Sequence, residues 1–303
     1  MKRFMIGQYG GFDYSKFSKD FRSNFYGIEN CLFETTEDEL NLVKEARELS
    51  FQIGVHYPFR ANPSRLRDAP FLASDVQLRE EAFEHALEEI EYLQRIQPEY
   101  VLFHYPKPVI LDDRVDWSRW RFTDSREYVK ESNYSYEELV QRTETLFQWL
   151  TKQSERFSFI PVLELDALNR YIYETDFLEK LLQKYPAIRL CLDTGRLYSQ
   201  ETIDPNFDSR QIIRTYAKYA HSIHLWNFQF INGEIKNHRC PVLPEHDPID
   251  GWAPIEEYLT IIRDENPDVR IMFEHNSSLI SEEKLEECYK WVERMLHYNS
   301  VKI

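Results

Sequence analysis

Short apolar runs alternate with longer amphipathic segments along the whole chain. Several of the runs are continuously apolar, such as Val101-Leu102-Phe103 and Ile271-Met272-Phe273. Continuous apolar runs are typical of strands that are buried on both faces. The pattern predicts eight such strands, at Arg3–Gln8, Tyr26–Phe33, Phe51–His56, Tyr100–His104, Phe159–Glu164, Ile188–Asp193, Ser222–Asn227 and Val269–Glu274.

Amphipathic helices are predicted between these strands. The clearest has Leu78, Ala82, Ala86, Ile90 and Leu93 on one face and charged residues elsewhere. The others are expected at Leu40–Leu49, Tyr136–Gln153, Asp176–Tyr185, Arg210–Tyr219, Ile255–Ile262 and Glu282–Leu296. Alternating strands and helices imply parallel strands with right-handed crossovers. Eight such units favour an α/β fold with one closed (β/α)8 barrel, a TIM barrel, over an open doubly wound sheet.

No linker or low-complexity segment divides the chain, so residues 1–303 are expected to form a single barrel domain. The longest irregular stretch, residues 106–133, follows the fourth predicted strand and contains Trp117 and Trp120. Stretches of this length inside a compact domain often serve as lids over a site. We therefore expect these two indole rings to cover a bound substrate.

The amino-acid composition mainly argues against whole classes of partner and location. The 52 acidic and 37 basic residues give a formal net charge of −15, so no nucleic-acid partner is expected, although a local basic patch is compatible with that charge. The four cysteines are far apart and lack CxxC spacing, which favours reduced thiols. No apolar run is long enough for a membrane span, and the first residues do not resemble a signal peptide. These features predict a cytoplasmic protein without a membrane partner; they leave open whether it is a homo-oligomer.

Acidic and imidazole side chains occur at the carboxyl ends of the predicted strands, where the active sites of barrel enzymes lie. Asp, Glu and His make up about one residue in five of the chain. Seven of the eight strand ends nevertheless carry one, namely Glu29, His56, His104, Glu164, Asp193, His224 and Glu274. A single such residue is most simply a polar group that faces solvent. Solvent exposure does not explain the whole set, because the carboxyl ends of the strands all point to one place.

Carboxylates and imidazoles gathered in this way need a compensating charge, and a divalent cation supplies it. Three carboxylates with one imidazole suit Mn, Mg, Co or Zn. The ligand types alone therefore do not identify the metal.

Five segments, in their order along the chain, resemble the xylose-isomerase-like barrel superfamily, which includes sugar isomerases, sugar epimerases and endonuclease IV. They are Leu163-Glu164, Cys191-Leu192-Asp193-Thr194-Gly195, His224-Leu225-Trp226-Asn227, His246-Asp247-Pro248-Ile249 and Phe273-Glu274. The resemblance covers nearly the whole chain. It implies a metal ion held by Glu164, Asp193, His224 and Glu274, and, as in the epimerases, a role for the two glutamates as the acid and base.

The chain departs from the superfamily pattern at two positions. Arg196 stands where members commonly carry a histidine, and Pro244 stands where the nuclease branch has an aspartate. A third metal site has thus lost two of its three ligands. His56 and His104 match ligands of a further ion bridged by Glu164, and they could equally bind substrate hydroxyls. Arg196 suits a phosphate or carboxylate of a substrate, with an ion pair to a neighbouring acid as the alternative.

The favoured function is a divalent-metal-dependent isomerase or epimerase that acts on a sugar, sugar phosphate or related polyol ketone through an enediolate. Glu164 and Glu274 are the expected base and acid. The residues expected to orient the substrate are His56, His104, Arg196 and His246. One alternative is a metal-dependent phosphodiesterase like the nuclease branch. Another is a barrel that binds a sugar or a metal without turnover.

Overall fold

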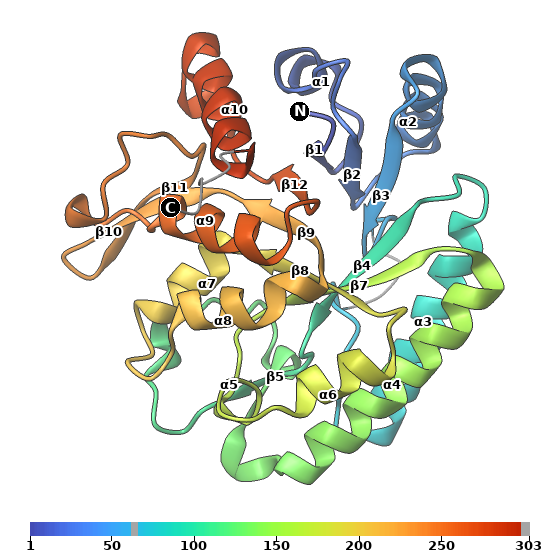
Figure 1. Ribbon diagram of the computed structural model, residues 1–303. Helices are drawn as coiled ribbons and strands as arrows, with labels where there is room; N and C mark the ends of the chain where they lie inside the picture. Colours follow the sequence, from blue (N-terminus) through green and yellow to red (C-terminus); the bar gives the residue numbers. More distant parts are fainter. Residues whose placement is uncertain (62–65, 298–303) are drawn as a thin grey trace.

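Eight parallel strands close into a barrel in the computed structural model, which describes residues 1–61 and 66–297 (Figure 1). The order around the barrel is β1–β2–β3–β4–β7–β8–β9–β12. Their bounds are β1 Phe4–Tyr9, β2 Gly27–Cys31, β3 Gln52–His56, β4 Tyr100–Tyr105, β7 Ile160–Leu165, β8 Arg189–Asp193, β9 Ala220–Leu225 and β12 Arg270–Phe273. Each overlaps one predicted strand, so the predicted (β/α)8 barrel is confirmed.

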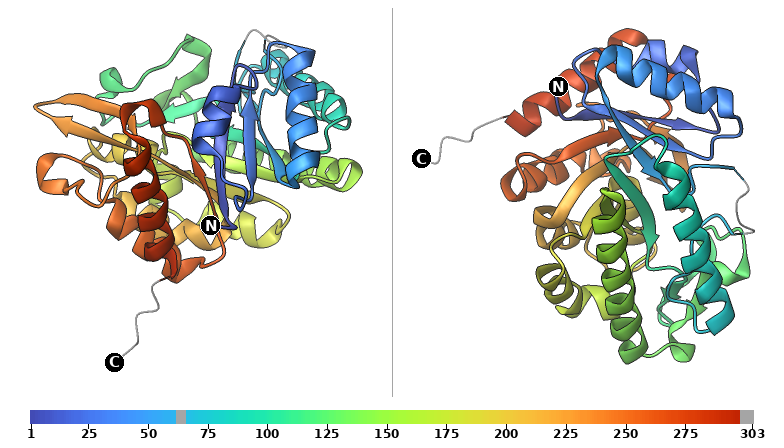
Figure 2. Two further views of the ribbon diagram at one scale, coloured as in Figure 1. Left: turned by 90° about the horizontal axis from the view of Figure 1, so that it is seen from above. Right: turned by 90° about the vertical axis from the view of Figure 1, so that its right-hand side faces the viewer.

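Helices surround the barrel, as two further views show (Figure 2). They are α1 Tyr14–Asp20, α2 Thr36–Leu49, α3 Val76–Leu93, α4 Tyr136–Phe157, α5 Arg170–Tyr173, α6 Phe177–Lys184, α7 Thr194–Glu201, α8 Ser209–Tyr216, α9 Ile255–Glu265 and α10 Glu282–His297. All seven predicted amphipathic segments are helical. The pattern missed α1 and α5, which are too short to show a clear apolar period, and α7, whose only aliphatic side chain is Leu197. None of the described helices has both the length and the apolar character that crossing a bilayer requires.

The strands are buried on both sides, which explains their continuous apolar runs. The barrel interior below the polar strand ends is filled by Met5, Tyr100, Leu102, Val162, Cys191 and Met272. Gly54 makes room for Tyr100, because a Cβ at this position would lie 2.2 Å from the tyrosine ring. All four cysteines are buried free thiols.

Two insertions project from the carboxyl ends of the strands. Residues 106–133, predicted to be irregular, contain the parallel pair β5 Val109–Leu111 and β6 Tyr128–Lys130 together with short 3₁₀ turns; we call them the β5–β6 segment. After β9, β10 Asn227–Ile231 and β11 Glu234–Cys240 form an antiparallel hairpin (Figure 1). The two insertions meet where the Arg119 guanidinium lies 5.1 Å from the centre of the Phe230 ring.

Candidate functional site

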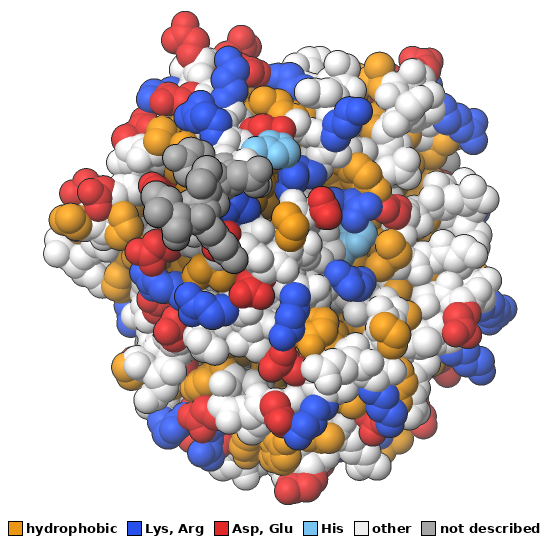
Figure 3. Space-filling view, in the orientation of Figure 1, with side chains coloured by type: hydrophobic (Ala, Val, Ile, Leu, Met, Phe, Trp, Pro, Cys, Tyr) orange, Lys and Arg blue, Asp and Glu red, His pale blue; other side chains and the backbone are white. Residues whose placement is uncertain are grey.

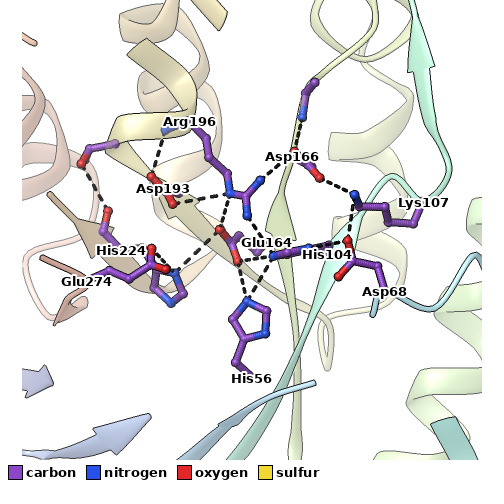
Figure 4. A network of polar contacts seen from close by, with 12 residues as sticks. His56, Asp68, His104, Lys107, Glu164, Asp166, Asp193, Arg196, His224 and Glu274 are labelled. Atoms are coloured by element: carbon purple, nitrogen blue, oxygen red, sulfur yellow. Dashed lines mark hydrogen bonds and ion pairs between the residues drawn. The ribbon is translucent and has the colours of Figure 1, made fainter. Parts of the chain in front are cut away.

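The structure brings together all seven acidic and imidazole residues at the strand ends. Sheet register places His104 beside Glu164 and Asp193 beside His224. The others come from β2, β3 and the residue after β12. Six of the seven are at most 6% exposed, and the Glu274 side chain is 20% exposed. The predicted convergence is therefore present at one end of the barrel interior (Figure 4).

Glu164 lies at the centre of this cluster. Its Oε2 atom lies 3.2 Å from His56 Nε2 and 3.1 Å from His104 Nε2. Its Oε1 atom accepts a hydrogen bond of 3.0 Å from Arg196 Nε and lies 3.7 Å from His224 Nδ1. Burial alone would raise the pKa of Glu164, but the charges of Arg196, His104 and His224 hold it well below its usual range. Glu164 is therefore a carboxylate at neutral pH.

The residues Glu164, Asp193, His224 and Glu274 fit a divalent cation. One ligand atom from each of the first three lies within 4.8 Å of the others, and Glu274 Oε2 lies 3.5 Å from His224 Nδ1. His224 Nδ1 and Glu274 Oε2 are buried without a hydrogen-bond partner in the described part of the chain. Burial and the carboxylates of Glu274 and Glu164 raise the pKa of Asp193 to about 7. A cation would satisfy the unpaired atoms and relieve the repulsion between the carboxylates.

His224 is oriented from behind by two residues. Its Nε2 atom lies 3.1 Å from the carboxylate of Glu29, and Tyr100 donates a 2.7 Å hydrogen bond to that carboxylate. A carboxylate on one ring nitrogen fixes the tautomer and leaves the other nitrogen as the ligand atom. The Nδ1 atom of His224 accordingly faces Glu164 and Glu274.

A second group of ligand atoms consists of His56 Nε2, His104 Nε2 and Glu164 Oε2, which lie 3.1–3.2 Å from one another. Neighbouring ligands of tetrahedral zinc lie roughly 3.3 Å apart, so this spacing also fits an ion. A fixed cation is already present beside it, because Arg196 Nη2 is 3.2 Å from His104 Nε2.

A buried network of charges supports His104 from the other side. Its Nδ1 atom lies 2.9 Å from Asp68. The Lys107 ammonium lies 2.8 Å from both Asp68 and Asp166. The charges of Lys107 and Arg196 outweigh burial and lower the pKa of Asp166 to about 2. Asp68, His104 and Asp166 could also hold an ion by position, but the lysine supplies their counter-charge.

Arg196 lies in the first turn of α7, where its backbone N–H donates to Asp193 Oδ1. Its guanidinium points into the site and donates to Glu164 and Asp166, at 3.0 and 2.9 Å (Figure 4). The structure thus shows the ion pair that the sequence left as the alternative to anion binding.

The remaining predicted residues lie in different places. Trp120 lines a cavity beside Asp193 and Arg196. Trp117 is buried next to Trp120, and the centres of the two indole rings lie 5.9 Å apart. His246 stacks on Trp252 at 3.7 Å and lines a separate cavity between α8 and α9. His246 thus lies beside Asn227, the residue that follows Trp226 after β9, with 3.4 Å between its Nδ1 and the amide nitrogen, and the structure does not bring it together with the residues around Glu164.

Sequence reasoning missed several residues of the site. Asp166 had a readable signal, because residues two apart in an extended segment share a face and it follows Glu164 at that spacing. Asp68 and Lys107 lie outside the barrel strands, where no period indicates their direction. Arg239, on the β10–β11 hairpin, lies 2.8 Å from Glu274 Oε1. Its charge contributes to holding the pKa of Glu274 below its usual range, against the effect of burial.

The raised pKa of Asp193 predicts how cation affinity depends on pH. Below about pH 7 a cation must displace the proton of Asp193, so the apparent affinity should rise with pH there. The pKa of His224 is raised well above its usual value despite burial, so the affinity should continue to rise above pH 7 as this second ligand loses its proton. Isothermal titration with Zn²⁺ between about pH 5.5 and pH 8 measures this slope. Asp193→Asn should bind more weakly and lose about one proton from the slope, and an unchanged slope would contradict the assignment of Asp193.

Solved structures share this fold over nearly the whole chain. A D-tagatose 3-epimerase-like protein has a TM-score of 0.63 and 14% identity, covering 96% of this chain and 97% of that one. A D-psicose 3-epimerase from Clostridium cellulolyticum H10, solved with D-tagatose, has a TM-score of 0.59 and 14% identity, covering 98% and 100%. The IolI protein with a bound zinc atom has a TM-score of 0.59 and 10% identity, covering 98% and 99%.

No protein-family model matches the sequence, and no curated protein matches it either. Identities this low establish a common fold, while the activity has to be argued from the site. The chain has the (β/α)8 fold of the xylose isomerase-like barrels, as its motifs predicted.

Proposed function

We propose that this protein is a divalent-metal-dependent isomerase or epimerase of a carbohydrate ketone, a sugar, sugar phosphate or related polyol. The observation that carries the proposal is the pair of carboxylates, Glu164 and Glu274, which both lie near the Nδ1 atom of His224, at 3.7 and 3.5 Å. The sugar epimerases among its structural neighbours support it.

Glu164, Asp193, His224 and Glu274 would hold the ion, for which Mn, Zn, Co and Mg remain candidates. When bound, such an ion polarises a carbonyl and the hydroxyl next to it, which acidifies the hydrogen on the carbon between them. The chain must then remove that proton and return one, on the other face for an epimerisation. Glu164 and Glu274 are the groups available, since both pKa values lie below the usual range and both start as bases.

His56 and His104 would bind substrate hydroxyls in this proposal. The Nδ1 atom of His56 lies 2.9 Å from the Tyr57 carbonyl oxygen, and that of His104 lies beside Asp68. Both Nε2 atoms face Glu164 Oε2, at 3.2 and 3.1 Å, so a hydroxyl bound there would exchange hydrogen bonds with the imidazoles and the carboxylate together. Trp120 would form a wall of the substrate site. The cytoplasmic location stays a prediction, and whether the protein is a homo-oligomer stays open.

Metal content tests the ligand assignment. We expect purified protein to carry at least one divalent ion per chain, and Asp193→Ala and His224→Ala to lose most of it, because each removes one of four protein ligands. Plasma emission spectroscopy measures the number of ions per chain. The exposed Asp113 lies outside the set, so Asp113→Ala should retain it. Full metal content in both ligand variants would refute the assignment.

The second candidate is a phosphodiesterase, which the His56–His104–Glu164 group favours by its fit to a further ion. The adjacent Arg196 guanidinium and the net charge of −15 oppose it. Incubation of the metal-loaded protein with abasic duplex DNA tests it. We expect neither tight binding nor cleavage, and cleavage that Glu164→Gln abolishes would reverse the order of the two candidates.

A further inference from the structure

A cavity of about 380 Å³ opens beside the candidate metal site, between the β5–β6 segment and the β10–β11 hairpin. This volume lies in the range of small-molecule sites. Its floor includes Asp193 and Arg196. The side chains that give it its character are four guanidiniums and an imidazole, those of Arg119, Arg121, Arg196, Arg239 and His238. Asp193 is the one carboxylate among its lining residues within the described chain.

This local excess of positive charge is opposite in sign to the whole chain, which carries −15. Acidic and basic side chains are mixed over the face seen in Figure 3. The cavity instead concentrates cations from two separate insertions, although the chain has 52 acidic residues with which to neutralise them. Such a concentration attracts an anion into the cavity.

The four arginines differ in whether they already form ion pairs with carboxylates of the protein. Arg196 is paired with Glu164 and Asp166, and Arg239 with Glu274. Arg119 donates to the Thr202 carbonyl oxygen and lies over the Phe230 ring, without a carboxylate. No carboxylate in the described residues pairs with Arg121, which is exposed at the cavity. Arg119 and Arg121 are thus the cations free to meet a ligand.

The walls of the cavity suit a carbohydrate. Trp120 and Trp226 line it, and the Trp226 ring lies over Gly195, where a Cβ would come within 2.2 Å of it. Trp226 is 5% exposed, and its indole N–H is buried without an acceptor among the described residues. Indole rings pack on the apolar faces of sugars, and an unpaired N–H can donate to a ligand oxygen.

We propose, resting on the isomerase or epimerase function above, that the substrate is an anionic carbohydrate. Its phosphate or carboxylate group binds Arg121 and Arg119 while its reacting carbons lie toward Asp193. A guanidinium offers several N–H donors in a planar fork, which matches the oxygens of either oxyanion. Arg196, predicted from the sequence to bind the anion, instead belongs to the floor of the cavity and is occupied by protein acids.

Inorganic phosphate tests the anion site without knowledge of the sugar. It should raise the melting temperature of the metal-loaded, full-length wild type and of Arg126→Ala, and raise that of Arg121→Ala much less. Arg126 is a matched control, because it lies in the same β5–β6 segment but is paired with Asp124 outside this cavity. Equal shifts in all three proteins would overturn the proposal.

Pairs of neutral and anionic sugars then identify the chemical class of the substrate. Titration calorimetry should show tighter binding of D-fructose 6-phosphate than D-fructose, or of D-galacturonate than D-galactose, and the two pairs distinguish phosphate from carboxylate. Arg121→Ala should weaken the anionic member by about tenfold to a hundredfold and leave neutral sugars unchanged. Equal losses for neutral and anionic ligands, or no preference for either anionic member, would overturn the inference.

Binding and turnover separate this inference from the proposed function. Arg121-dependent binding of an anionic sugar without any exchange of its carbon-bound hydrogens supports the anion site and counts against the isomerase or epimerase. Turnover of neutral ketoses that is unaffected by Arg121→Ala has the opposite meaning: it supports the enzyme and refutes the anionic substrate.

Discussion

Replacement of Glu164 by Gln should lower kcat by about 10²–10⁴-fold, the usual contribution of a general acid or base. The amide keeps the size of the side chain but cannot accept the substrate proton. Glu274→Gln should give a loss of the same order, because a reaction that removes a proton on one face and returns one on the other needs both groups. Turnover at saturating metal measures both variants.

Metal content must be measured on the same samples, since both glutamates are also proposed ligands. A loss of activity that excess metal fully restores would show that the residue only binds the ion. Asp113→Asn, an exposed acid of the β5–β6 segment, should retain full activity. If either Gln variant turned over substrate at the wild-type rate, the acid–base assignment would be wrong.

Arg196→Ala should destabilise the metal-free protein by about 3 kcal/mol, because it removes the guanidinium from a buried ion pair and leaves the Glu164 carboxylate with imidazoles alone as compensation. Glu164 is 1% exposed and would lose its guanidinium, whereas Asp166 would keep Lys107. Bound metal should restore part of the loss, since the cation would also neutralise Glu164. Denaturant unfolding with and without the ion measures both effects.

The control for this variant is Arg156→Ala, which breaks an exposed pair with Glu91 and should cost less than about 1 kcal/mol. Kinetics then separate the two roles of Arg196. Neutral and anionic substrates should lose turnover alike, because the guanidinium acts on Glu164 and Asp166. A loss confined to anionic substrates would show that Arg196 binds the anion directly.

The fold could be predicted because its signal is local. A strand buried on both faces, such as β4, has an apolar residue at nearly every position, and a long helix such as α4 repeats its apolar face over many turns. The barrel also explains why the site residues could be found. Once eight parallel strands close, the residue at each carboxyl end faces the same mouth, so Glu164, Asp193 and His224 could be grouped without coordinates.

The rest of the site depends on contacts between distant segments. For Arg196 the sequence left anion binding and an ion pair as alternatives. The structure shows the ion pair, because Asp193 caps α7 and that turn directs the guanidinium inward to Glu164. The residues that complete the charge balance, Asp68, Lys107 and Arg239, lie outside the barrel strands, where no period indicates direction. Residues 106–133 lack a strong apolar period and were expected to be a loop, but Val109, Leu111 and Trp117 pack against Ala167 and order them.

In the proposed function, this barrel uses a bound cation and two glutamates to move a carbon-bound proton. Incubation in D₂O with Mn²⁺ and a panel of ketoses and their phosphates, followed by proton NMR, tests it most directly. We expect deuterium at the carbon next to the carbonyl of at least one sugar, with formation of its epimer or isomer. This exchange should disappear with EDTA and in Glu164→Gln. Exchange that persists without metal, or metal-loaded protein that exchanges no hydrogen in any sugar of the panel, would contradict the proposed function.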